Sequence, residues 1–98
     1  MRLWGTNMEF LIKSIEPKNE FVKNKYYPMM VGRECDVIDL IFGWPGILRV
    51  DMAYDPGHPH RFYTTPVKKL VTPDDGTIVF ETENSVYTLV PSKLKIKE

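Results

Sequence analysis

The sequence predicts an all-β fold, namely a small barrel of five to seven short antiparallel strands. Apolar and polar residues alternate in several short segments, and turn signals recur at intervals of roughly 8–12 residues. A length of 98 residues also suits a barrel of this size better than a larger sandwich. Closing the barrel would remove the exposed edges that an open sheet leaves.

The N-terminal third contains two predicted strands. Residues 9–16 alternate as a strand does, and this alternation places Ile12 and Ile15 on opposite faces. A second, short strand is expected over residues 21–27, where it would be ended by Pro28.

Residues 34–42 fit two interpretations. Their apolar residues alternate at positions 38, 40 and 42, as in a strand, but those at 37, 38 and 41 also fit the spacing of a helix. The enrichment in β-branched residues and the Gly-Trp-Pro-Gly turn at residues 43–46 favour the strand.

Residues 47–54 show the clearest alternation in the chain. Leu48, Val50 and Met52 are expected to face one way and the residues between them the other, which predicts a half-buried antiparallel strand. Residues 55–60 contain two prolines and a glycine, so we expect an exposed loop there.

The C-terminal part is predicted to consist of hairpins. Residues 62–71 are extended but contain Pro66, which indicates a strand at a sheet edge or one with a bulge. Asp-Gly within residues 72–76 and the pair Asn84-Ser85 mark tight turns. The strands that these turns separate are expected at residues 77–83, 86–90 and 94–96.

Residues 64–70 (TTPVKKL) and 75–89 (DGTIVFETENSVYTL) carry a resemblance. They resemble the C-terminal half of short uncharacterised bacterial and phage proteins that contain an SH3-like small β-barrel. The resemblance implies an SH3-like barrel and an origin in bacteria or phage. It transfers no functional residue to this chain.

Composition and sequence patterns predict the domain organisation and the cellular location of the protein. We predict a single domain over residues 8–98, preceded by a disordered or non-native extension at residues 1–7, because the first strand pattern begins after Met8. Cys35 is the only cysteine, the N-terminus has no secretory signal pattern, and no apolar run is long enough to span a bilayer. We therefore expect a cytoplasmic protein with no membrane association.

No constellation of residues predicts catalysis or cofactor binding. Cys35 lies in a strand pattern without an activating motif, so we expect a buried core residue and not a nucleophile. His58 and His60 follow Asp55 in one loop, but a metal site needs more ligands and an organised surrounding shell. We expect no enzymatic activity, no metal and no cofactor.

The sequence therefore favours a non-catalytic binding or interaction module. Aromatic, imidazole and guanidinium groups are concentrated near one turn and one loop, and the candidate binding residues are Trp44, Arg49, Tyr54, His58, His60, Arg61, Phe62 and Tyr63. We expect a protein partner, or a homodimer formed by pairing of exposed strand edges. The alternative is a nucleic-acid-binding barrel, which requires a basic surface beside exposed rings. Lys plus Arg equals Asp plus Glu, at 13 each, so this alternative is the less favoured.

Overall fold

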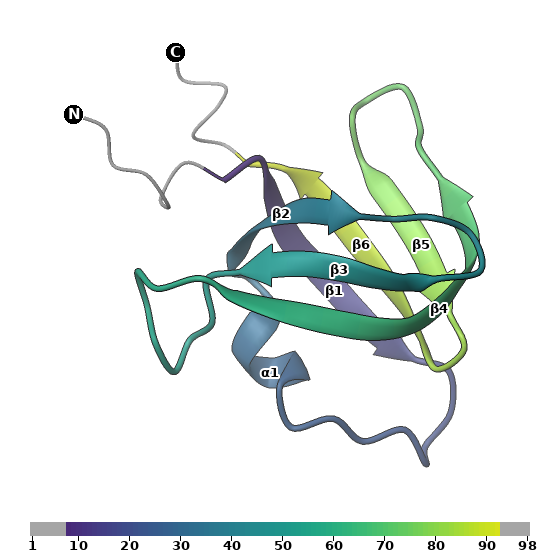
Figure 1. The fold of residues 1–98 in the computed structure, drawn as a ribbon, viewed down its shortest axis with the longest axis horizontal. Coiled ribbons are helices and arrows are strands. Elements are labelled where there is room, and N and C mark those ends of the chain that lie inside the picture. The colour runs from purple at the N-terminus through teal and green to yellow at the C-terminus, as the bar shows by residue number, and fades with distance from the viewer. Residues whose placement is uncertain (1–7, 93–98) are drawn as a thin grey trace.

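The computed structural model describes residues 8–92 (Figure 1). The expected extension at residues 1–7 and the expected strand at residues 94–96 lie outside the described residues. Within the described range the elements are β1 (Phe10–Pro17), α1 (Tyr27–Met30), β2 (Glu34–Asp39), β3 (Pro45–Val50), β4 (His60–Val71), β5 (Ile78–Thr82) and β6 (Ser85–Pro91).

The six strands of the described range form a closed antiparallel barrel in the order β1-β2-β3-β4-β5-β6, and β6 pairs back onto β1. This confirms the predicted all-β fold, and the architecture is consistent with a small SH3-like barrel. In Figure 1, β2, β3 and the first part of β4 cross in front of β1, β6 and β5. The barrel is therefore flattened into two layers, and the core lies between them.

The seam between β1 and β2 is the shortest pairing in the barrel. These strands pair through Phe10 with Cys35 and Leu11 with Glu34, whereas β1 and β6 pair along the whole length of β1. Within residues 8–92, the second half of β2 therefore has a ladder partner on the β3 side only. A register shift between Val37 and Asp39 interrupts that half of the strand.

The predicted faces of β1 are wrong, although the strand itself is confirmed. Ile12 and Ile15 are both buried in the core. The register with β6 shifts between Ile12 and Ser14, which is the signature of a β-bulge. One extra residue in a strand reverses the alternation that follows it, so both isoleucines point inward.

The second strand expected over residues 21–27 is also wrong. The chain forms a loop there and then the single helical turn α1, which contains Pro28 near its start. Proline is tolerated in the first helical turn, where its missing N–H would have no partner in any case. The turn buries Met30 and directs Tyr27 inward, where its hydroxyl lies 3.2 Å from that of Tyr87.

The strand interpretation of residues 34–42 is confirmed for Glu34–Asp39. Leu48, Val50 and Met52 are all buried, as their alternation predicts. β4 pairs with both β3 and β5, so Pro66 does not mark a sheet edge. Instead the pairing of β4 shifts register on either side of Pro66, which agrees with the predicted bulge.

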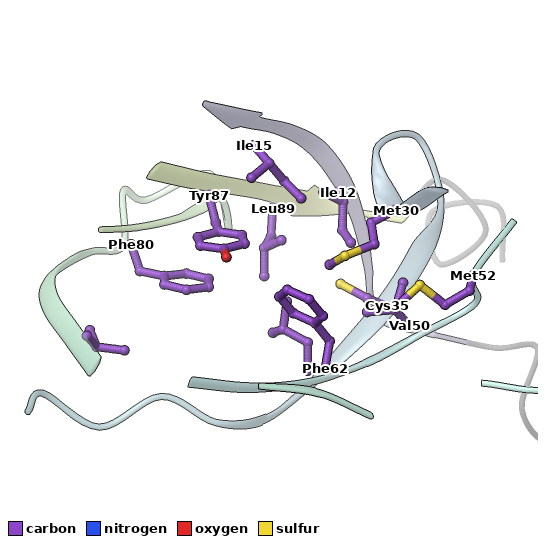
Figure 2. Close-up of a cluster of buried hydrophobic side chains, with 12 residues drawn as sticks. Ile12, Ile15, Met30, Cys35, Val50, Met52, Phe62, Phe80, Tyr87 and Leu89 are labelled. Atoms are coloured by element: carbon purple, nitrogen blue, oxygen red, sulfur yellow. The ribbon is translucent and has the colours of Figure 1, made fainter. Parts of the chain in front are cut away.

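The core is a contiguous cluster between the two layers (Figure 2). Phe80 of β5 and Tyr87 of β6 are cross-strand partners, and their rings stack with centroids 4.6 Å apart. Cys35 is fully buried in this cluster, and burial raises the pKa of its thiol to about 12. The cysteine is thus a core residue, as expected from the sequence.

Candidate functional site

The candidate residues do not form one site, because the structure separates them to opposite ends of β3. Trp44 immediately precedes this strand, whereas Tyr54 follows it. Figure 1 shows the loop before β3 and the loop after it on opposite sides of the molecule. At a rise of about 3.3 Å per residue, the six-residue strand holds the two loops roughly 20 Å apart.

Phe62, one of the candidate binding residues, is buried in the core. It is 9% exposed and belongs to the core cluster (Figure 2), and its ring packs edge-to-face with that of Tyr27, with the ring centroids 6.4 Å apart. Alternate residues of a strand face opposite sides, so the inward position of Phe62 places Arg61 and Tyr63 on the outer surface of β4. Both of these neighbours are exposed.

The outer surface of β2, β3 and β4 carries an apolar hollow, which we call the Trp44 face. The hollow has a volume of about 260 Å³ and is lined by Asp39, Ile41, Trp44, Pro45, Ile47 and Tyr63. Ile47 at its centre pairs with Asp39 on one side and with Tyr63 on the other, so one row of residues crosses three strands. Trp44 is 67% exposed and Tyr63 is 58% exposed, which leaves both rings available to a partner.

Backbone hydrogen bonds hold the loop that carries Trp44 against β4. The N–H of Gly43 donates to the carbonyl of Val67 at 2.8 Å, and the N–H of Val67 donates to the carbonyl of Trp44 at 2.9 Å. The N–H of Trp44 donates to the carbonyl of Ile41 at 3.0 Å. Gly43 has a φ of 89°, which glycine adopts without steric cost. The exposed ring is therefore presented by a fixed backbone.

Close packing beneath the hollow depends on Gly46. This residue is buried, and its N–H donates to the Thr64 hydroxyl oxygen at 2.8 Å. A Cβ atom at this position would lie 3.0 Å from a methyl carbon of Leu40 and 3.1 Å from that hydroxyl oxygen. The absence of a side chain at this position leaves room for the side chains of Leu40 and Thr64 just before Ile47.

Some charged residues of this surface form ion pairs within residues 8–92 and others do not. Arg49 forms an ion pair with Asp36 at 2.9 Å, so its charge is already matched within the sheet. Arg61 lies directly opposite Arg49 on β4. Within residues 8–92, the side chains of Arg61 and Asp39 make no hydrogen bond or ion pair.

The remaining candidates gather at the other end of β3, in a cluster ordered by Asp55. Its carboxylate oxygens lie 3.1 Å from His58 Nδ1 and 2.9 Å from His60 Nε2. The hydrogen bond with His60 lowers the pKa of Asp55, and His58 adds to the effect. The His60 ring packs against the Tyr54 ring, with their centroids 5.4 Å apart, and the centroid of the Tyr54 ring lies 6.2 Å from that of Tyr26. These contacts order the loop.

Neither this cluster nor any other within residues 8–92 brings together three or more histidine, cysteine, aspartate or glutamate side chains in a geometry suited to a metal ion. Over the same part of the chain, no helix has the length and apolar character needed to cross a membrane.

Sequence reasoning missed the residues that complete the hollow. Asp39, Ile41 and Ile47 were not selected, yet each of them lines it. One signal was available for Ile47, which occupies an outward position of β3 next to inward-facing Leu48 and so places an apolar side chain on the polar side of the alternation. No local signal identifies Asp39, because its position beside Ile47 depends on the pairing of β2 with β3.

The chain matches no protein-family model, and no curated protein or solved structure matches it significantly.

Proposed function

We propose that this protein is a non-catalytic interaction module that binds a protein partner through the Trp44 face. The observation that carries the proposal is the clustering of exposed Trp44, Tyr63 and Ile41 around one hollow. Contiguous apolar patches on a protein surface commonly mark interaction sites. Tryptophan and tyrosine are also among the residues that contribute most of the binding energy in protein interfaces.

The rigidity of the hollow supports the same proposal. Ile47 and Tyr63 lie on paired strands, and the loop that carries Trp44 is hydrogen-bonded to β4. A surface that is already ordered loses little conformational entropy when a partner binds. Binding free energy can then come from the apolar contacts themselves.

Docking of side chains into the hollow is better supported than strand addition. The barrel is closed, and in the β2 strand the unpaired edge within residues 8–92 is the second half. That segment contains the register shift between Val37 and Asp39, and it carries the acidic residues Asp36 and Asp39. Bulges and charges are the features by which edge strands avoid pairing with other chains.

Nucleic-acid binding is the less supported alternative. It needs a basic surface beside the exposed rings, because neutralisation of phosphates drives such binding. Two arginines that could have formed a basic stripe are engaged, Arg33 by Asp51 at 2.8 Å and Arg49 by Asp36. Asp39 lines the hollow itself, and its negative charge would repel a phosphate.

Affinity capture with matched variants tests the proposal. Trp44→Ala should abolish the retention of binding proteins, whereas Phe21→Ala should not, because Phe21 is an equally apolar ring, 82% exposed, on the loop before α1. Equal retention by the wild type and Trp44→Ala would refute the proposal. Binding of labelled DNA or RNA that weakens from about 50 to 200 mM salt, and that Trp44→Ala abolishes, would favour the alternative.

A further inference from the structure

We infer that the partner of the Trp44 face is a second copy of this chain, and that Arg61 of each protomer enters the hollow of the other and pairs with Asp39. This inference rests on the proposed function, because it assumes that the Trp44 face is an interaction surface. It adds the identity of the occupant and the contacts that orient it.

The first observation is that two unmatched opposite charges share one apolar surface. Asp39 lines the hollow, and Arg61 lies two residues before Tyr63 on β4, so that both β4 side chains point outward. Neither Asp39 nor Arg61 has a hydrogen-bond or ion-pair partner for its side chain within residues 8–92.

The second observation is that the two charges do not meet within one molecule. Asp39 is on β2 and Arg61 is on β4, with β3 between them, so their backbones are two strand spacings (about 10 Å) apart across the sheet and are also offset by two residues along the strands. Asp36, which lies opposite Arg49 on β2, is already paired with that arginine, and Arg49 faces Arg61 across β3 and β4. Arg61 thus lies beside a like charge and, within the part of the chain that the structure describes, forms no ion pair with an acid.

Twofold symmetry would give both Asp39 and Arg61 a partner of opposite charge. In a symmetric dimer, if a residue of one protomer contacts a second residue of its partner, the reverse contact forms too. An axis that passes between the hollow and Arg61 therefore creates two Asp39–Arg61 pairs. In each hollow the guanidinium group would also meet the exposed rings of Trp44 and Tyr63, and aromatic faces attract such cations.

The same symmetry covers the apolar part of the surface. Trp44, Tyr63 and Ile41 of one protomer are buried against the corresponding surface of the other, which removes the exposed patch from water. The apolar contacts supply the affinity, and the charge pairs determine how the two copies are oriented.

Sedimentation velocity of the full chain over a range of concentrations tests the inference. The wild type should shift from the monomer mass of 11.4 kDa toward twice that mass as concentration rises. Asp39→Arg and Arg61→Asp should each raise the dimer dissociation constant at least about 100-fold, because each replaces two attractive contacts with two like-charge contacts. Lys23→Asp, a charge reversal on the exposed loop before α1, should leave dissociation unchanged.

Mixing the two single variants gives the sharpest result. Alone, each should be monomeric with an unchanged circular dichroism spectrum. Mixed in equal amounts, they should form a heterodimer, because the native Arg61 of one variant then meets the native Asp39 of the other, and the two substituted side chains form a pair of the same kind with the charges exchanged. The double variant Asp39→Arg/Arg61→Asp should likewise recover a dissociation constant within about tenfold of the wild type.

Two outcomes overturn the inference. One is a wild type that stays monomeric at all concentrations, and the other is a mixture that fails to associate although both variants are folded. Either outcome leaves the proposed function intact if capture of another protein still depends on Trp44. If capture does not depend on Trp44 either, the proposed function fails with it.

Discussion

Replacing Leu48 with alanine should destabilise the fold far more than replacing its neighbour Ile47, although both changes shorten an aliphatic side chain to a methyl group. Leu48 is 0% exposed and belongs to the core cluster, where it pairs with Val37 and Phe62 across the sheet. Ile47 directly precedes Leu48 in β3, faces the outer surface and lines the hollow. The comparison therefore separates the two sides of one strand.

The magnitude follows from burial. Leu→Ala substitutions at fully buried sites cost about 2–5 kcal/mol, including the cavity that remains. In a domain of this size each kcal/mol lowers the melting temperature by roughly 4–8 °C, so Leu48→Ala should lower it by at least about 8 °C. Ile47→Ala should cost less than about 1.5 kcal/mol, since its side chain is only partly removed from water. It should, however, weaken self-association.

Urea unfolding followed by circular dichroism measures both free energies, at a protein concentration where each variant is monomeric. Sedimentation at higher concentration then measures the association of the same two samples. An equal loss of stability in Leu48→Ala and Ile47→Ala would refute the assignment of Ile47 to an exposed surface. Unchanged association in Ile47→Ala would argue against the Trp44 face as the interface.

Two further predictions concern titratable groups. Burial, together with the negative charges of Asp36 and Glu34, raises the pKa of Cys35 to about 12. The thiol of the native protein should therefore resist alkylation by iodoacetamide at pH 8 and react readily only in urea. Rapid alkylation of the native protein would contradict the burial of Cys35. The hydrogen bond with His60 lowers the pKa of Asp55 below its ordinary value of 3.8, so its contribution to stability is complete above that pH and is lost as the pH falls through the native pKa. Asp55→Asn should therefore lower the melting temperature more at pH 6 than at pH 2, and a difference that is constant with pH would contradict this reasoning.

Strand alternation made much of the fold predictable. Leu48, Val50 and Met52 are buried because a strand with one face on the core repeats every two residues, and that period is visible in the sequence. The predicted face of Ile15 was wrong because this period is interrupted in β1. A bulge breaks the period, and it forms through pairing with β6, which is distant in the sequence. The one-turn helix at Tyr27–Met30 is too short to display a helical period at all.

The candidate site was predictable residue by residue but not as an arrangement. Trp44 and Tyr63 were selected individually, and both are exposed on the same surface. Phe62 was grouped with Tyr63, but Phe62 is buried whereas Tyr63 is exposed, because consecutive strand residues face opposite sides, and that rule alone could have separated them. Asp39 could not have been placed in the same row as Tyr63 without the register of β2, β3 and β4, since these residues are far apart in the sequence and Ile47 joins them only through strand pairing.

Closure of the barrel limits how this protein can associate. Because most strand edges in residues 8–92 are paired, backbone hydrogen bonds can contribute little to recognition, and side chains on a sheet face must provide it. Apolar contacts between Trp44, Tyr63 and Ile41 would favour association but would tolerate many orientations, since the hydrophobic effect is not directional. An ion pair between Asp39 and Arg61 is directional, and in a low-dielectric interface it carries a heavy penalty when one member is left unpaired. In the proposed dimer, the charges of Asp39 and Arg61, which have no partner within residues 8–92, would select one orientation from the many that the apolar surface allows.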